Sequence, residues 1–177
     1  MSKWTERYGR IYFSIPIPSL SGPEWFFHLR NNNIKISETA HELLFDSNFN
    51  TTTSSIERIV LVRQSQFLGS GKQVNLEELL SSRKNDFIKP PRELGCAMLS
   101  FFSPEEIKSM VSVDDEGKRK AGDLDFNIFI SHPFKDQEKD SMVFYISCES
   151  GIISLEAITI FSLRYLTKVV GFVFKVQ

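Results

Sequence analysis

Three short runs in the last third of the chain constrain its fold most strongly. They cover residues 125–131, 142–148 and 169–176, and they are rich in β-branched and aromatic residues. Within each run the apolar side chains alternate, which is typical of a strand with one buried face. The alternating sets are Phe126, Ile128 and Ile130, then Met142, Phe144, Ile146 and Cys148, and finally Val170, Phe172, Phe174 and Val176. A sheet is therefore predicted as the framework of the core.

Further strand signals lie on either side of these runs. Residues 10–15 form a first strand that ends at the Ile-Pro-Ile-Pro sequence, because proline removes a backbone donor from the sheet. Residues 56–67 are apolar without alternation at Ile59 to Val62, which indicates a strand covered on both faces. Residues 152–161 fit a strand or a helix, and their β-branched content favours a strand.

Helix-start signals recur through the first two thirds of the chain. Four residues can cap a helix start and are each followed by an acidic residue within the first turn. They are Ser21, Ser37, Asn75 and Ser103. Residues 92–102 add a segment with apolar side chains at helical spacing. Helices and strands are segregated along the chain, which favours an α+β fold over a doubly wound one. We predict a mostly antiparallel sheet of about five or six strands, with several short helices packed on one face.

The chain length of 177 residues and the 41% hydrophobic content favour a single globular domain over residues 1–177. Residues 1–18 are expected to form an edge strand or a docking arm. We expect that removing this segment abolishes partner binding and leaves the fold largely intact. Residues 112–123 carry acids, then bases, with two glycines, and they predict a mobile charged loop.

Charge and cysteine content narrow the function classes. The net charge is −1 and the sequence has no block rich in Lys and Arg, which argues against nucleic-acid binding. Scattered basic residues gathered on one face by folding would be the alternative. Cys96 and Cys148 fall on predicted buried positions and lack the spacing of a zinc site. The N-terminal residues do not resemble a signal peptide, and charges interrupt the apolar stretch 151–176, so we expect a cytoplasmic protein without a membrane span.

Two motifs invite a catalytic interpretation. The glycines and lysine of residues 69–72 do not satisfy the spacing of a phosphate-binding loop. Asp123 and Asp125 lie at the start of a predicted strand, and His132 follows that strand before a proline. Two carboxylates could hold a divalent metal, and a histidine at a strand end could act as a general base. A small metal-assisted hydrolase or nuclease using these three residues is therefore the alternative function.

Exposed aromatic residues provide the preferred hypothesis. The first segment contains more aromatic side chains than one helix and one strand can easily bury. They are Trp4, Tyr8, Tyr12, Trp25 and Phe27. Such a surface is typical of a docking site. We therefore predict a non-catalytic protein–protein interaction module, a small adaptor or accessory subunit without a cofactor. Its partner would be another protein or a second copy of the chain.

Overall fold

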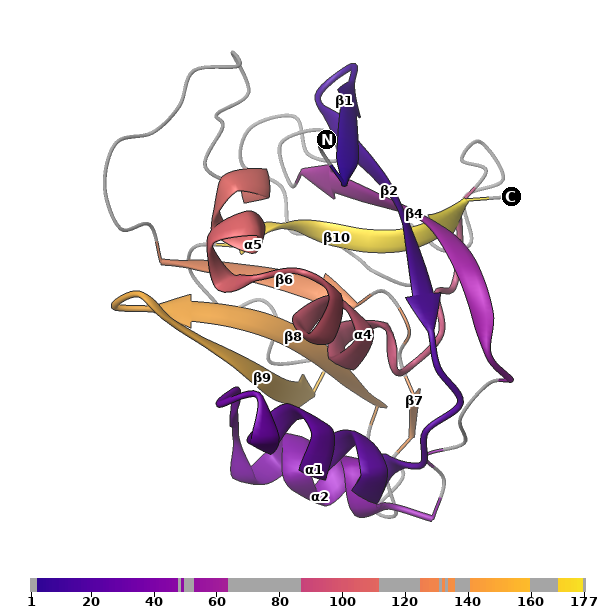
Figure 1. Cartoon of the computed structure of the whole chain (residues 1–177), viewed down its shortest axis with the longest axis vertical. Coiled ribbons are helices and arrows are strands. Elements are labelled where there is room, and N and C mark those ends of the chain that lie inside the picture. Colours follow the sequence, from indigo (N-terminus) through magenta and orange to yellow (C-terminus); the bar gives the residue numbers. More distant parts are fainter. Residues whose placement is uncertain are drawn as a thin grey trace.

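A computed structural model describes most of the chain, namely residues 3–47, 49, 53–63, 87–111, 125–130, 132, 134–135, 141–159 and 169–176. Its elements (Figure 1) are β1 (Trp4–Arg7), β2 (Arg10–Ile17), α1 (Gly22–Asn31), β3 (Lys35–Ile36), α2 (Glu38–Phe45), β4 (Ser55–Arg63), β5 (Phe87–Ile88), α4 (Leu94–Phe101), α5 (Pro104–Val111), β6 (Phe126–Ile130), β7 (Phe134–Lys135), β8 (Ser141–Glu149), β9 (Ile152–Thr159) and β10 (Val169–Val176). The α+β class is therefore confirmed.

The strands form one mixed sheet in the order β1-β2-β4-β10-β6-β8-β9-β3, with β5 also paired to β10 and β7 to β8. The pairings in the described residues are antiparallel except for β10 with β6 and β9 with β3. The expected count of five or six strands was too low. The missed strands are β1, β3, β5 and β7, which have two to four residues each and are too short to show an alternating pattern.

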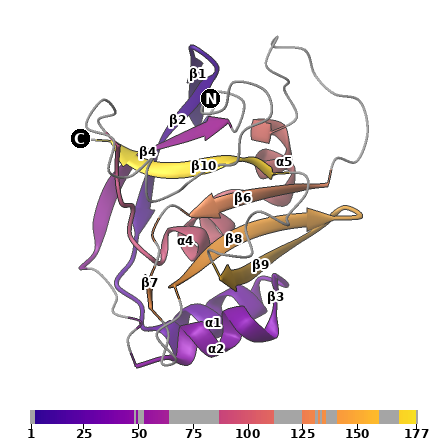
Figure 2. The same ribbon diagram turned by 180° about the vertical axis from the view of Figure 1, so that it is seen from behind.

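Strand β10 joins the two halves of the sheet. It lies between β4, to which it is antiparallel, and β6, to which it is parallel (Figure 2). The strands predicted at residues 125–131, 142–148 and 169–176 are confirmed as β6, β8 and β10, and the ambiguous segment after Gly151 is a strand. Strand β4 is buried on both faces, as its unbroken apolar centre predicted.

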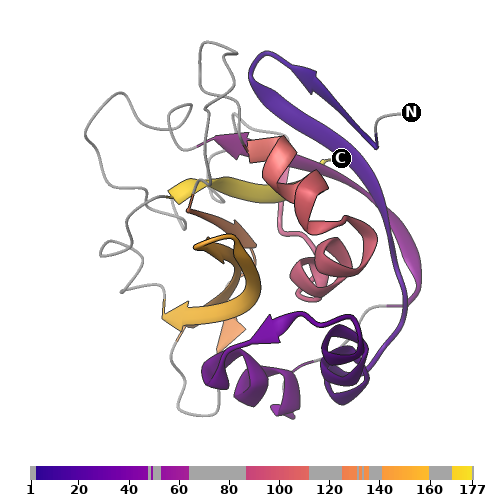
Figure 3. The ribbon, with the colours of Figure 1, turned by 60° about the vertical axis from the view of Figure 1, so that its left-hand side comes forward.

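The sheet curves around helix α4, which is buried almost all round (Figure 3). We call the face toward α4 the inner face and the other the outer face. Buried residues of all four described helices, α1, α2, α4 and α5, belong to one cluster with the inner face. Alternation in β10 divides its side chains, since Val173 joins this cluster while Phe172 and Phe174 join a second buried cluster on the outer face.

The predicted helix starts are confirmed where the structure describes them. Ser21 and Ser103 form reciprocal capping boxes with Glu24 and Glu106, and the Ser37 side chain accepts from the Ala40 N–H. These bonds satisfy backbone donors that a helix N-terminus would otherwise leave unpaired. The helix expected after Asn75, the glycine-rich residues 69–72 and the charged loop at 112–123 lie outside the described residues.

The first eighteen residues are not a detachable arm. Strand β2 continues through Pro16 to Ile17, and it is paired to β4 from Ile11 to Ile17. Four of its side chains, Ile11, Phe13, Ile15 and Ile17, are buried in the inner core. Removing residues 1–18 would therefore open the core, contrary to our expectation. Among the described strands the edge position belongs to β1, which pairs with residues 10–13 and leaves the end of β2 without a described neighbour on that side.

Candidate functional site

Strand alternation sorts the charges of β1 and β4 onto opposite faces of the sheet. In both strands a glutamate directly precedes an arginine, as Glu6-Arg7 and Glu57-Arg58. Adjacent residues of a strand point to opposite faces. Glu6 lies opposite the core residue Ile11, and Glu57 is itself buried, so both glutamates face inward. Both arginines consequently face outward, where their side chains are exposed.

Each inward glutamate has a basic partner. Arg63 Nη1 donates to Glu6 Oε1 at 3.1 Å, and Lys175 Nζ lies 2.6 Å from Glu57 Oε2. Burial opposes ionisation of Glu57, but the hydrogen bonds from Lys175 and Ser55 outweigh it and lower the pKa of the carboxyl group. The negative charges of these strands are therefore neutralised on the inner face.

The outer face of β1, β2 and β4 is left with a positive charge. By the register of these strands, side chains of one face lie next to one another across the sheet. We call this set the basic face, and it consists of Thr5, Arg7, Arg10, Tyr12, Ser14 and Arg58. It contains three arginines and no acidic residue. Arg7 and Arg58 make no ion pair with any residue that the structure describes.

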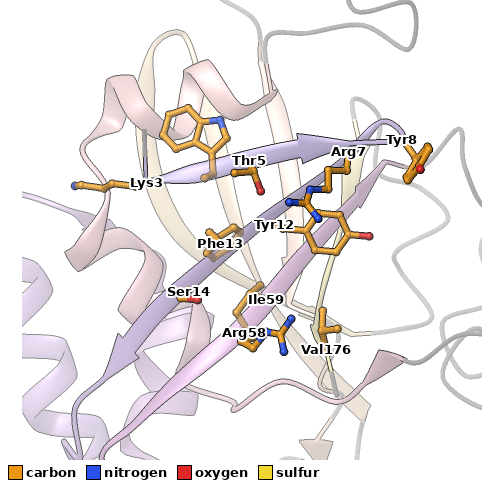
Figure 4. Close-up of a pocket in the computed structure, with 11 residues that line it drawn as sticks. Lys3, Thr5, Arg7, Tyr8, Tyr12, Phe13, Ser14, Arg58, Ile59 and Val176 are labelled. Atoms are coloured by element: carbon orange, nitrogen blue, oxygen red, sulfur yellow. The ribbon is translucent and has the colours of Figure 1, made fainter. Parts of the chain in front are cut away.

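A cavity of about 630 Å³ lies over the basic face (Figure 4). Its lining residues come from β1, β2, β4 and the end of β10, and from the residues beside β1. They are Lys3, Trp4, Thr5, Arg7, Tyr8, Tyr12, Phe13, Ser14, Arg58, Ile59 and Val176. In Figure 4 the Arg7 guanidinium lies beside the Tyr12 ring, in keeping with their diagonal positions on neighbouring strands. The cavity therefore combines basic groups with aromatic rings and hydroxyls.

Tyr8 occupies an unusual place at the rim of this cavity. It forms, with Gly9, the two-residue turn between β1 and β2, and both residues have positive φ, 53° and 72°. These angles match a type I′ turn, which favours Asn and Gly because a side chain at positive φ is strained. The Tyr8 side chain is nevertheless 96% exposed. An exposed aromatic residue at a strained position is a feature of functional sites.

Lys3 has a different role from the outward arginines. Its ammonium group donates to the Phe101 carbonyl and to Glu106 Oε2, each at 2.9 Å, and it lies over the Phe101 and Phe102 rings. These contacts attach the start of β1 to α4 and α5. Lys3 therefore holds the hairpin in place.

The lining residues suit binding rather than catalysis. Guanidinium groups can pair with carboxylate or phosphate in a bidentate manner, and hydroxyls can donate to the same oxygens. Tyrosine rings offer apolar surface together with a polar tip. Among the described residues, the lining contains no His, Cys, Asp or Glu side chain to act as base, acid or metal ligand. The arrangement therefore fits an anionic ligand that also carries apolar groups.

The structure brings together three of the five predicted aromatic residues. Trp4, Tyr8 and Tyr12 line the cavity. Trp25 is fully buried in the inner core, where it packs as part of α1, so it contributes nothing to a surface. Phe27 is 61% exposed, but it lies on α1 at the opposite end of the molecule from β1 (Figure 1).

The residues of the alternative hydrolase site do not come together. Asp125 and His132 lie at opposite ends of β6, seven positions apart. At about 3.3 Å per residue, an extended strand separates them by about 20 Å. Asp125 accepts from the Ser150 N–H in the turn between β8 and β9, which is a structural role. Asp123 is outside the described residues, within which no three His, Cys, Asp or Glu side chains cluster as a metal site requires.

The His132 ring instead contacts Pro90 and Arg92, in the segment that precedes α4. Its Nδ1 is hydrogen-bonded to the Pro90 carbonyl, and its Nε2 accepts from Arg92 Nε at 3.4 Å. Burial lowers the pKa of the imidazole, and the Arg92 charge adds to that effect. The two thiols are also buried, as predicted, and burial raises the pKa of Cys96. Neither thiol is placed to act as a nucleophile.

The two arginines of the cavity were not among the predicted site residues. Their signal in the sequence is the Glu-Arg pair, because opposite charges at adjacent strand positions must point to opposite faces. That signal becomes readable only when the strands are known. Residues 4–7 show no alternating apolar pattern, so the sequence did not assign the Glu6-Arg7 pair to a strand.

No family model matches the chain, and neither a curated protein nor a solved structure is significantly similar to it. Among the described residues, no helix has the length and apolar content needed to cross a membrane.

Proposed function

We propose that the protein is a non-catalytic binding module that uses the basic face to hold an acidic segment of a protein partner. Arg7 and Arg58, which are exposed and make no ion pair with any described residue, support the proposal. Carboxylates of a partner would pair with Arg7 and Arg58, and apolar side chains would contact the Tyr8 and Tyr12 rings. The strained, exposed position of Tyr8 supports the same surface.

An acidic protein segment fits this face better than nucleic acid does. Nucleic-acid sites follow a charged backbone with a long track of basic groups. The basic face has three arginines within one corner of the sheet, on a chain whose net charge is −1. Two buried free cysteines support the cytoplasmic location that we assume for this module.

Fluorescence anisotropy with labelled peptides tests the proposal. We expect a peptide that alternates Glu with Phe to bind more tightly than its counterpart with Lys in place of Glu. The double variant Arg7→Glu/Arg58→Glu should lose this binding. Arg30→Glu/Lys35→Glu changes the net charge by the same amount on exposed residues outside the basic face, and should keep it.

A labelled single-stranded oligothymidine serves as the competing ligand. If it binds more tightly than the acidic peptide, and through the same arginines, the partner is nucleic acid and the proposal is wrong. Equal binding of the acidic and basic peptides would also contradict it. Circular dichroism of each variant confirms that the fold is retained.

A further inference from the structure

The exposed side of α1 and α2 carries a second aromatic surface, and its charge is opposite to that of the basic face. Phe26 contacts Phe27, His41 and Phe45, with ring centroids 5.4, 4.8 and 5.5 Å apart. Glu38 and Glu42 are exposed on α2 and share one side of the helix with Phe45, because they lie three and four residues apart. We call this set the acidic aromatic face, and it consists of Phe26, Phe27, Glu38, His41, Glu42 and Phe45.

This surface leaves large apolar groups in contact with water. Phe27 is 61% exposed and Phe45 46% exposed. Helix α2 packs its other side, with Ala40, Leu43 and Leu44, into the core, so Phe45 is not part of that packing. Clustered exposed aromatic residues mark a docking surface. Acidic residues outnumber basic ones on residues 21–47, where Glu24, Glu38, Glu42 and Asp46 stand against Arg30 and Lys35.

The two faces lie at opposite ends of the longest axis of the molecule (Figure 1), and Figure 3 shows the same separation. One copy of the chain therefore cannot bring its own two faces together. A second copy can, because its α1–α2 end presents the carboxylates and rings that the basic face of the first copy is suited to hold.

Symmetric pairing of like faces is disfavoured by charge. Pairing two basic faces would bring the arginines of one copy, Arg7 and Arg58, next to the same arginines of the other. Pairing two acidic aromatic faces would likewise bring together Glu38 and Glu42 of both copies. Direct pairing of two β1 edges also meets like charges. In the antiparallel registers centred on Glu6 and on Thr5, which keep the inner faces on one side, Glu6 lies opposite Glu6 and Lys3 lies opposite Arg7, respectively.

We infer that the partner of the basic face is the acidic aromatic face of a second copy, so that copies associate head to tail. This inference rests on the proposed function of the basic face, and it names the acidic segment as α2. Glu38 and Glu42 of one copy pair with Arg7 and Arg58 of the next, while Phe27 and Phe45 contact the tyrosine rings. Because the contact is between unlike faces, it repeats into a ring or an open chain.

Sedimentation velocity of the whole chain at low and high salt tests the inference. We expect the mass of the wild-type protein to grow with concentration at low salt and to return to that of a monomer at high salt. Each of the double variants Arg7→Gln/Arg58→Gln and Glu38→Gln/Glu42→Gln should weaken association by about tenfold or more. Glu105→Gln/Glu149→Gln alters two exposed glutamates elsewhere and should leave association unchanged.

Mixing the two association-deficient variants gives the sharpest result. Each retains one intact face, so an equimolar mixture should form a complex of one copy of each and grow no further. A wild-type protein that stays monomeric at every concentration would overturn the inference. So would wild-type association that the variants leave intact.

Failure of the inference is distinguishable from failure of the proposed function. A monomer that binds the alternating Glu and Phe peptide through Arg7 and Arg58 has another protein as its partner. A monomer that binds no acidic peptide refutes both proposals.

Discussion

Arg63 of β4 reaches across β2 to Glu6 of β1, and its Nη1 donates to Glu6 Oε1 at 3.1 Å. The Arg63 side chain is 6% exposed, whereas that of Glu6 is 40% exposed. Within the described part of the chain, Nε and Nη2 of Arg63 have no hydrogen-bond partner. A buried guanidinium therefore depends on one carboxylate from the edge strand, which ties the outermost hairpin to the centre of the sheet.

Glu6→Gln should lower the free energy of unfolding by about 2 kcal/mol, because it removes the one described carboxylate that neutralises the buried Arg63 charge. The partial exposure of Glu6 keeps the loss below that of a fully buried pair. Urea unfolding measures the change, and Glu105→Gln on exposed α5 is the control. A loss as small as that of the control would show that water already neutralises Arg63.

Tyr8→Asn should raise the free energy of unfolding by about 1 kcal/mol, since Asn tolerates the positive φ of this turn position. The same change should weaken binding of the acidic peptide, because it removes an exposed ring from the cavity rim. Tyr8→Phe is the matched control, which keeps the ring and gains no stability. Unchanged peptide binding by Tyr8→Asn would remove Tyr8 from the proposed site.

Gly22→Ala should destabilise the protein, although Ala is the better helix former by about 1 kcal/mol. A Cβ at residue 22 would lie 1.7 Å from the Leu44 carbonyl oxygen, so α1 and α2 would have to move apart. We expect a net loss of about 2 kcal/mol or more in thermal or urea unfolding. Asn31→Ala, at the exposed end of the same helix, is the control and should cost little.

Stability should fall as the pH drops below about 6.5, because His132 takes up a proton more readily in the unfolded chain. Its folded-state pKa is lowered by burial, so the folded protein binds fewer protons in this window. The stability that neutral His132 contributes is fully present above the unfolded-state pKa of the imidazole. It is lost as the pH falls toward the lower folded-state pKa. Urea unfolding as a function of pH measures this slope, and His132→Gln should flatten it. An identical slope in both proteins would contradict the prediction.

The sequence predicted those elements whose signal is local. Capping boxes at Ser21 and Ser103 predicted two helix starts because the bonds involve residues three positions apart. The alternation of β6 and β8 predicted strands and their inward sets, because side-chain direction in a strand has a period of two. Both kinds of information are contained in short windows of the chain.

The sequence did not predict what depends on distant contacts. The parallel pairing of β10 with β6 and the burial of Trp25 arise from tertiary packing that no short window encodes. Asp125 and His132 are close in sequence, yet a strand keeps them apart. Arg7 and Arg58 are far apart in sequence, and pairing of β2 with both neighbours gathers them on one face. The candidate site was therefore predicted in its aromatic part and missed in its basic part.

Because β10 lies at the centre of the sheet but is synthesised last among the described strands, the sheet cannot be completed until translation is nearly over. β10 is translated after β1 through β9. Until then, the edges of β4 and β6 that pair with β10 in the folded sheet have no partner strand. Such unpaired apolar edges are templates for wrong pairing with other chains. A nascent chain of this protein would therefore need its last strand, or a chaperone in its place, to keep the two half-sheets from aggregating.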